Sequence, residues 1–195
     1  MKYILVGIPN AGKSTLGAQA AKTLKLPFYD TDTLSAEKMK LQGLNFFSMS
    51  YANRLIEMQE KILLEIIQKD ESSIIATGAI LPVDGGLDDI LPKIGIVIHI
   101  KRNIEFACAS ALDKKGMIMI QIGENGKPLP ETEINMSEKA VEAYATDLPV
   151  LEKISHFAIE NNDDIESGVE KLAALITRTA PTTGSSDYTL LRRLK

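Results

Sequence analysis

The sequence predicts an α/β fold in which helices cover both faces of a five-stranded parallel sheet. The first observation is that short, continuously apolar runs alternate with longer segments whose apolar residues recur every three or four positions. Continuously apolar runs are typical of strands buried on both faces, and the alternation is typical of a doubly wound, three-layer α/β/α arrangement. The second observation is that glycines or aspartates follow several of these runs, at the sheet edge where such folds bind ligands.

The five expected strands are the apolar runs themselves. The first ends at Gly7, and the third ends just before Thr77 and Gly78. Right-handed crossovers place the carboxyl ends of parallel strands along one edge, so the residues that follow the runs are expected to lie close together. The expected strands cover residues 2–7, 27–30, 72–76, 95–100 and 156–159.

Helices are expected between these strands because the intervening segments carry apolar residues at helical spacing. In the longest of them, Leu55, Met58 and Ile62 recur at intervals of three and four. The expected helices cover residues 13–24, 49–68, 104–112, 137–154 and 165–176.

Two segments are expected to be irregular. Residues 114–135 contain three glycines and two prolines, and a stretch of this length inside a compact domain is usually functional or disordered, so we expect a lid. Residues 179–195 begin with a stretch rich in Ser, Thr, Pro and Gly and are expected to form a flexible tail. The chain is thus expected to be one domain over residues 1–178, followed by this tail.

Composition and charge narrow the classes of function. The formal charge of −4 argues against binding nucleic acid through a broad basic face. Cys108 is the only cysteine, so an internal disulfide is excluded, and a small buried side chain is a better interpretation than a catalytic thiol. The apolar run after Lys2 is too short for a signal peptide or a membrane span. We expect a cytoplasmic monomer without membrane or nucleic-acid partners.

The strongest motif is the segment 7–14, GIPNAGKS, which fits G-x-x-x-x-G-K-[ST] and lies between an expected strand and an expected helix. Its glycines let the backbone aim N–H groups at phosphate oxygens, and the following helix adds the positive end of its dipole. Lys13 is expected to reach the β- and γ-phosphates, and the Ser14 hydroxyl to bind Mg²⁺. The motif predicts a P-loop NTPase fold. The expected nucleotide-binding residues are Gly7, Asn10, Ala11, Gly12, Lys13, Ser14 and Thr15.

Two aspartates are expected to close the second strand. Because successive strand residues point to opposite faces, Asp30 and Asp32 are expected to point the same way, into the site. One carboxylate could hold the water shell of magnesium, and the other could accept a proton from a substrate hydroxyl. The alternative is that one of the two aspartates only caps the next helix, and for Asp32 that role is contested by Ser35.

Other residues have both a functional and an ordinary interpretation. Arg54 and Glu57 share one helix face, where a surface ion pair of little energetic value is the ordinary interpretation. Gly78 either permits close approach of the backbone to a ligand or simply ends a strand. His99 and His156 lie in apolar strands without Cys or carboxylates at ligand spacing, so core or strand-end histidines are expected rather than metal ligands.

The order of these motifs resembles that of the shikimate kinase family, within the P-loop kinases of small metabolites, over residues 1–176. That family has F-x-D-x-D after the first helix, Arg-x-x-Glu on the next long helix, Ala-Thr-Gly-Gly-Gly after the third strand, and Arg-x-Pro-Leu-Tyr near the end. The matching segments here are GIPNAGKSTLG at 7–17, FYDTD at 28–32, RLIE at 54–57, ATGAI at 76–80 and DLPVL at 147–151.

The resemblance implies roles for the matching residues. Asp30 would lie near the magnesium ion, and Asp32 would hold a substrate hydroxyl and help to deprotonate it. Arg54 would bind the substrate carboxylate, a task suited to its planar guanidinium, and Glu57 would steady it. The implied catalytic residues are Lys13, Asp32 and Lys115, the implied substrate-binding residues are Asp32, Arg54, Gly78 and Ala79, and the implied metal ligands are Ser14 and Asp30.

The chain departs from the family pattern on the acceptor side. Ala79 and Ile80 replace the second and third glycines of the triplet, and Asp147 replaces a substrate-binding arginine. In the expected lid, Lys115 is the nearest counterpart of the family's arginine, and lysine offers charge without bidentate geometry.

The predicted function is ATP- and Mg²⁺-dependent transfer of the γ-phosphate to a hydroxyl group, with shikimate as the first choice of acceptor, in aromatic amino acid biosynthesis. Two alternatives stay open. One is a shikimate-kinase-like protein that phosphorylates a different hydroxylated metabolite, and the other is a non-catalytic ATP-binding regulatory module. Asp147 and the missing lid arginine favour the module, whereas the aspartate pair and Arg54 favour the kinase.

Overall fold

The computed structural model describes residues 1–41, 49–78, 82, 87–107 and 136–180. Its strands are β1 (Lys2–Val6), β2 (Phe28–Asp30), β3 (Ser73–Ala76), β4 (Ile96–Lys101) and β5 (Phe157–Glu160). They form one five-stranded parallel sheet in the order β2-β3-β1-β4-β5. The order reverses direction at β1, which is the switch point where ligands bind in doubly wound sheets.

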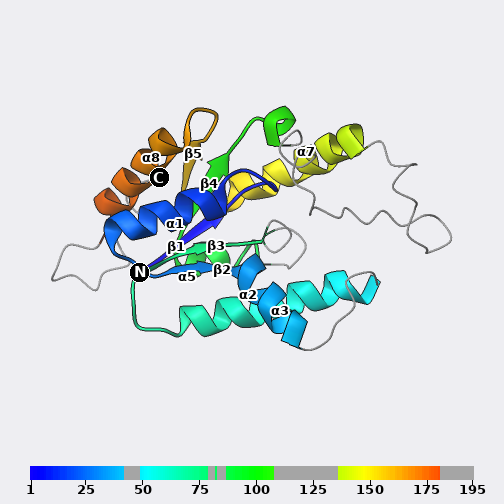
Figure 1. The fold of residues 1–195 in the computed structure, drawn as a ribbon, viewed down its shortest axis with the longest axis horizontal. Helices are drawn as coiled ribbons and strands as arrows, with labels where there is room; N and C mark the ends of the chain where they lie inside the picture. Colours follow the sequence, from blue (N-terminus) through cyan, green and yellow to red (C-terminus); the bar gives the residue numbers. More distant parts are fainter. Residues whose placement is uncertain (42–48, 79–81, 83–86, 108–135, 181–195) are drawn as a thin grey trace.

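The connecting helices complete the layers. They are α1 (Lys13–Leu24), α2 (Thr31–Leu41), α3 (Met49–Ile67), α5 (Leu91–Ile94), α7 (Met136–Ile154) and α8 (Ile165–Thr179). Figure 1 shows α1 and α8, which pack against each other, on one side of the sheet and α3, with α2 against it, on the other. The predicted α/β/α fold class is confirmed.

Strand β1 lies at the centre of the core. Leu5 is paired with Ala76 on one side and with Ile98 on the other. All five β1 residues are buried, as expected for a strand with helices on both faces. Burying one side chain of this size contributes about 1.5–3 kcal/mol, so β1 is a firm support for the loop that follows it.

The predicted strands are all present, each with bounds within one residue of those expected. Helix α8 runs on to Thr179, three residues past its expected end and into the first residue of the predicted tail. Helices α2 and α5 were not predicted, because the first has no marked apolar stripe and the second spans only four residues. The predicted lid at 114–135, Cys108 and residues 181–195 lie outside the described residues, as does the end of the helix expected at 104–112.

The histidines have the core and strand-end positions that the sequence predicts. His99 is 1% exposed, and burial, followed by the charge of Lys101, lowers its pKa to about 4. His156 Nδ1 accepts a hydrogen bond of 3.0 Å from Val97 N. In the part of the chain that the structure describes, no three His, Cys, Asp or Glu residues group as a metal site. None of the described helices has the length and apolar character needed to cross a bilayer.

Candidate active site

The P-loop, residues 7–12, connects β1 to α1. Gly7 has a φ of 153° and Gly12 a φ of 98°, both backbone conformations that favour glycine. A Cβ at Gly7 would lie 2.6 Å from the carbonyl oxygen of Ile100, and one at Gly12 would collide with Asn161 Nδ2. The shape of the loop therefore needs both glycines of the motif, apart from any contact with a ligand.

Lys13 is buried within this loop, with 7% of its surface exposed. Its Nζ donates hydrogen bonds to the carbonyl oxygens of Gly7, at 2.8 Å, and Ile8, at 3.1 Å. Burial lowers the pKa of Lys13 to about 8, while the charges of Asp32 and Asp30 raise it. A desolvated ammonium interacts more strongly with an anion than one in water does, which suits a phosphate-binding group.

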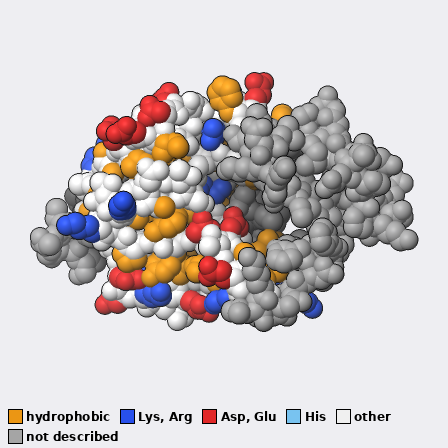
Figure 2. All heavy atoms as spheres, in the orientation of Figure 1, with side chains coloured by type: hydrophobic (Ala, Val, Ile, Leu, Met, Phe, Trp, Pro, Cys, Tyr) orange, Lys and Arg blue, Asp and Glu red, His pale blue; other side chains and the backbone are white. Residues whose placement is uncertain are grey.

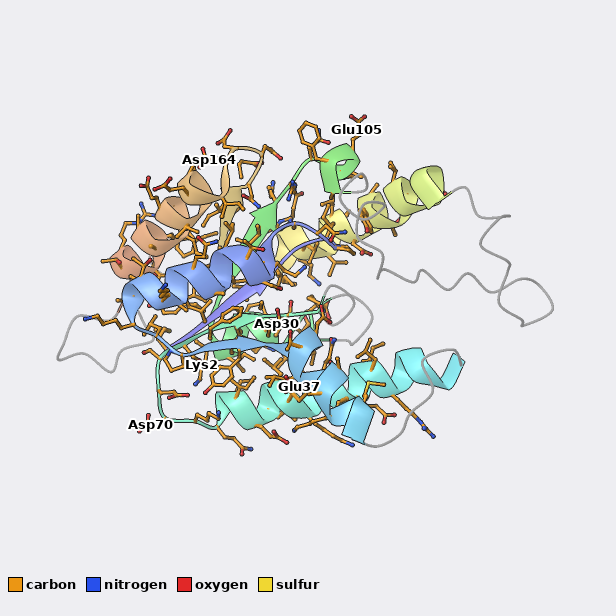
Figure 3. All side chains as sticks on the ribbon, in the orientation of Figure 1. Lys2, Asp30, Glu37, Asp70, Glu105 and Asp164 are labelled. Carbon is orange, nitrogen blue, oxygen red and sulfur yellow. The ribbon has the colours of Figure 1, made fainter. Side chains whose placement is uncertain are left out.

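The two aspartates come together by a route that the sequence did not predict. Asp30 is the last residue of β2, but Asp32 lies in the first turn of α2, so the expected alternation along one strand is wrong. The reversal from strand to helix, rather than the pleat, places both carboxylates near Lys13, whose pKa both of them affect. Figure 3 shows Asp30 beside the start of α2, and Figure 2 shows acidic side chains at this junction with a basic side chain close by.

The residue that caps the N-terminus of α2 is Asp30. Asp30 Oδ1 accepts a hydrogen bond of 3.0 Å from Thr33 N, as an N-cap residue does. The Ser35 hydroxyl instead donates to the carbonyl oxygens of Thr31 and Asp32, inside the helix. One of the two aspartates thus caps the helix, and it is Asp30. Neither Asp32 nor Ser35 does so, and the Asp32 side chain is left for another role.

The Asp32 carboxylate is held by a residue that the sequence did not single out. Gln59 Nε2 donates a hydrogen bond of 2.6 Å to Asp32 Oδ1, and Gln59 is 1% exposed. Desolvation raises the pKa of Asp32, Lys13 lowers it, Asp30 raises it, and the Gln59 hydrogen bond lowers it. A polar residue on the apolar stripe of the long helix was the one sequence signal for Gln59.

The end of β3 is tied to the same place. Gly78 N donates a hydrogen bond of 2.8 Å to Thr31 Oγ1, and Thr31 is fully buried. A Cβ at Gly78 would lie 2.5 Å from Asp32 Oδ1 and from both polar atoms of the Gln59 amide. Gly78 is therefore required by side chains of the protein itself, and it is more than the end of a strand.

Two further residues, which follow β4 and β5 at the same edge of the sheet, donate hydrogen bonds to the P-loop. Asn161, just after β5, donates from Nδ2 to the Ala11 carbonyl oxygen at 2.7 Å and is 7% exposed. Arg102, just after β4, donates from Nη1 to the Asn10 carbonyl oxygen at 3.3 Å. Neither residue was predicted from the sequence, although each follows an apolar strand at the edge where ligands bind.

The remaining predicted site residues are either exposed on helices or outside the described residues. Ser14 and Thr15 are exposed in the first turn of α1, and Arg54 and Glu57 are exposed on α3. Among the ion pairs of the described residues, none joins Arg54 to Glu57, so the ordinary interpretation as a surface ion pair is not supported. The other predicted site residues, Ala79 and Lys115, and the substituted Ile80 lie outside the described residues.

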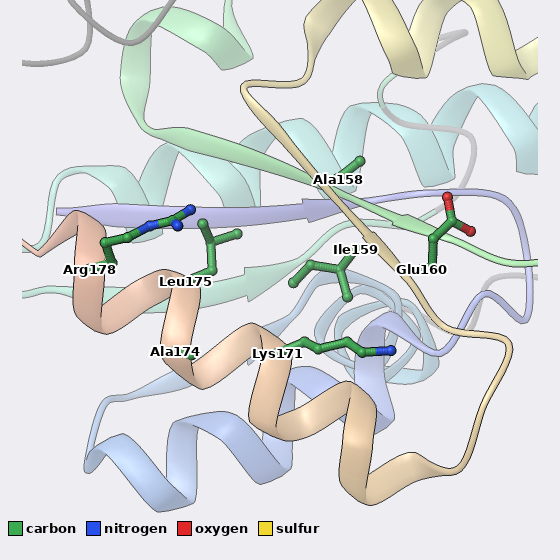
Figure 4. A pocket seen from close by; sticks show the side chains of 7 residues that line it. All are labelled: Ala158, Ile159, Glu160, Lys171, Ala174, Leu175 and Arg178. Atoms are coloured by element: carbon green, nitrogen blue, oxygen red, sulfur yellow. The ribbon is translucent and has the colours of Figure 1, made fainter.

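A groove of about 540 Å³ lies elsewhere, between β5 and α8. Figure 4 shows Lys171 and Leu175 of α8 extending toward β5 across it. Its lining residues are Ala158, Ile159, Glu160, Lys171, Ala174, Leu175 and Arg178. None of them is a predicted site residue, so this groove is separate from the candidate active site.

Comparison with known sequences identifies relatives over most of the chain. The family model described as shikimate kinase matches residues 9–177. A shikimate kinase of Clostridium botulinum (strain 657 / Type Ba4) is 31% identical over 164 residues, which cover 84% of this chain and 89% of that relative. A shikimate kinase of Francisella tularensis subsp. novicida (strain U112) is 26% identical over 167 residues, covering 80% and 93%.

Solved structures agree on the fold. Shikimate kinase from Acinetobacter baumannii in complex with shikimate has a TM-score of 0.69 at 18% identity, covering 92% of this chain and 95% of that one. Shikimate kinase from Bacteroides thetaiotaomicron has a TM-score of 0.67 at 20% identity, covering 91% and 98%. The P-loop fold and the family resemblance inferred from the motifs are confirmed. The chain belongs to the shikimate kinase family and is a phosphotransferase that acts on a hydroxyl group.

Proposed function

We propose that this protein transfers the γ-phosphate of ATP to a hydroxyl group of shikimate. The observation that carries the proposal is the meeting of Lys13 and Asp32 at the carboxyl edge of the sheet, where a phosphate-binding cation lies near a carboxylate held by Gln59. A donor phosphate on the P-loop and an acceptor hydroxyl at Asp32 would then be neighbours. The shikimate bound by the Acinetobacter relative supports the choice of acceptor.

On the donor side, the P-loop N–H groups and the start of α1 bind the phosphates. Lys13 exchanges its hydrogen bonds to Gly7 and Ile8 for phosphate oxygens. The exposed Ser14 hydroxyl and the Asp30 carboxylate are oxygen donors of the kind Mg²⁺ prefers, so these residues would hold the ion. When bound, Mg²⁺ supplies charge that offsets the negative charge of the β- and γ-phosphates. Asn10, Ala11 and Thr15 complete the proposed nucleotide site.

On the acceptor side, Asp32 orients the substrate hydroxyl and accepts its proton as the new bond to phosphorus forms. Desolvation raises the pKa of Asp32 overall, and Lys13 and the Gln59 hydrogen bond oppose this rise by favouring the ionised carboxylate that this role requires. Arg54 binds the substrate carboxylate with two parallel hydrogen bonds. Gly78 and Ala79 line the substrate site, and Lys115 supplies a positive charge from the lid, over residues 114–135.

Replacement of Asp32 by Asn tests the proposal. The Asn side chain keeps the shape but cannot accept a proton in the same way, so kcat with shikimate is expected to fall by about 10²–10⁴-fold. The Kd for ATP is expected to change by less than about threefold, because the residue acts on the acceptor. ADP release coupled to an optical assay measures the first, and calorimetric titration the second. Unchanged turnover by the Asn variant contradicts the proposed role.

A different hydroxylated metabolite is the second candidate acceptor, favoured by the substitutions at Ala79, Ile80 and Asp147. A panel of polyols and hydroxy acids in the same assay separates the two. Turnover on another alcohol, with none on shikimate, would overturn the choice of acceptor and keep the class of reaction. A domain over residues 1–178, a cytoplasmic location and a monomeric state stay predictions.

A further inference from the structure

Gln59 is a polar residue on the buried face of α3. Its neighbours on that face include Ile62, Leu63 and Ile66, which are all buried in the apolar core. The side chain of Gln59 is as buried as these, at 1% exposed. Burying an amide in an apolar core is unfavourable unless hydrogen bonds replace those to water, so its position requires an explanation.

The amide of Gln59 makes one short, directed contact. Nε2 donates to Asp32 Oδ1 at 2.6 Å, and Oε1 has no hydrogen-bond partner among the described residues. The reverse orientation of the amide would set Oε1 against a carboxylate oxygen, with two acceptors facing each other. The carboxylate of Asp32 therefore requires that the NH₂ group of Gln59 faces it. The Gln59 side chain keeps this one contact even though its Oε1 is left without a hydrogen bond among the described residues.

The hydrogen bond also explains the space left open at Gly78. A Cβ there would lie 2.5 Å from Asp32 Oδ1 and 2.5 Å from each of Nε2 and Oε1 of Gln59. The Gly78 backbone is fixed in turn by its hydrogen bond to Thr31 Oγ1. The end of β3, the first turn of α2 and the middle of α3 thus meet at the Asp32–Gln59 contact.

We propose that Gln59 is a positioning residue, which holds Asp32 by one carboxylate oxygen so that the other oxygen faces the acceptor hydroxyl. The inference rests on the proposed role of Asp32 in phosphoryl transfer. No hydrogen bond to Asp32 Oδ2 occurs among the described residues, so that oxygen is available. Because the Gln59 amide is neutral, it restrains the carboxylate without changing the total charge of the site.

The groups that face Asp32 determine how the proposal can be measured. Lys13 from the P-loop lowers the pKa of Asp32, Asp30 from β2 raises it, and the amide of Gln59 from α3 lowers it by donating to the ionised form. Removing only the amide donor leaves the two charges in place. A loss of rate in such a variant is therefore assigned to the lost contact and not to a change of charge.

The test compares Gln59→Met with Gln68→Met in the intact protein. Methionine keeps the length of the side chain and removes the donor, and Gln68 is exposed just beyond the end of α3. We expect Gln59→Met to lower kcat by about 10- to 100-fold, since a misplaced catalytic group costs up to about that much. We expect the Kd for ATP to stay within about twofold, so that the loss falls on kcat. Gln68→Met is expected to match the native protein in both.

A double-mutant cycle with Asp32→Asn identifies the residue through which Gln59 acts. Gln59→Met is expected to have little further effect on kcat once Asp32 is Asn. An equal loss in both backgrounds would overturn the positioning role and leave Gln59 as core packing. If Gln59→Met does not fold by thermal melting, Gln59→Asn, which is too short to reach Asp32, carries the same test.

Failure of the proposed function gives a different result. If the native protein does not turn over shikimate, the cycle is run with the acceptor from the panel that does support turnover. If Asp32→Asn keeps full activity, the base role fails whatever the Gln59 variants do. The Gln59 inference is overturned only where Asp32→Asn is impaired and the two residues act independently.

Discussion

The two halves of the site are held by different kinds of contact. The donor half is residues 7–15, which include Lys13, and the acceptor half surrounds Asp32 and Gly78. The donor half is fixed by backbone geometry at two positive-φ glycines, by carbonyl oxygens bound to Lys13, and by Asn161 and Arg102, which follow β5 and β4. The acceptor half depends on hydrogen bonds to two side chains, from Gln59 to Asp32 and from Gly78 N to Thr31, and on the space at Gly78.

This difference indicates which half of the site tolerates amino-acid substitutions. A loop shaped by its own backbone tolerates little change, and all positions of the P-loop motif match the family pattern. Side-chain contacts can be exchanged one at a time, and the substitutions at Ala79, Ile80 and Asp147 are at positions that the family pattern predicts for the acceptor side. Variants that affect one half and spare the other test whether the two halves are held separately.

Lys13→Ala is expected to have the largest effect. It removes the buried cation that we propose contacts the transferring phosphate, so kcat/KM for ATP is expected to fall by at least about 10³-fold. Steady-state assays at varied ATP measure it. Lys22→Ala, an exposed lysine in the last turn of the same helix, is the matched control. A loss of less than tenfold would contradict the assigned donor role.

Arg54 variants are expected to affect the acceptor half alone. Charged hydrogen bonds of the kind proposed contribute about 1.5–3 kcal/mol, so Arg54→Ala is expected to raise KM for shikimate by about 10- to 100-fold. Arg54→Lys is expected to recover only part of the affinity, because an ammonium cannot bind the carboxylate with two parallel bonds. KM for ATP should stay constant, and Lys61→Ala on the same helix serves as the control. Equal losses for both substrates would contradict the separation of the halves.

Asn161→Asp is expected to weaken ATP binding by about tenfold. The change replaces the donor to the Ala11 carbonyl oxygen by an acceptor, which leaves that buried oxygen unsatisfied and adds a negative charge beside the phosphates. Asn162→Asp is the control, because Asn162 is exposed and its Oδ1 accepts from Asn103 N, which a carboxylate can also do. Calorimetric titration with ATP measures both. Equal Kd values for the two variants would show that Asn161 is not a brace for the loop.

The smallest expected effect is the pH dependence of ATP binding. Lys13 binds phosphate in its charged form and has a pKa of about 8 in the free protein. Affinity is therefore expected to be constant below that pH and to fall as the pH rises above it, by up to about tenfold per unit. Titrations between about pH 7 and pH 8.5, over which the expected loss is about fourfold, test the sign. Affinity that does not fall above pH 8 contradicts the lowered pKa.

Much of the fold was predictable because its signals are local. The apolar runs of the strands and the helical spacing of α1 and α3 reflect burial, which each segment records in its own residues. Helix α2 was missed because its sequence lacks a marked apolar stripe, and this omission led to the wrong strand geometry for Asp32. Gln59 was missed for a related reason, since one polar residue on an apolar stripe does not say what it contacts.

The sequence by itself determined the P-loop and the order of the strands along the chain, because both follow from contacts between residues close in sequence. Only the tertiary structure decided which distant residues complete the site. Asn161 reaches Ala11 across 150 residues and Gln59 reaches Asp32 across 27, and such contacts depend on sheet order and helix packing. The donor half is accordingly evident in the sequence, whereas the residue that holds the acceptor carboxylate became evident only when α2, α3 and the end of β3 were brought together.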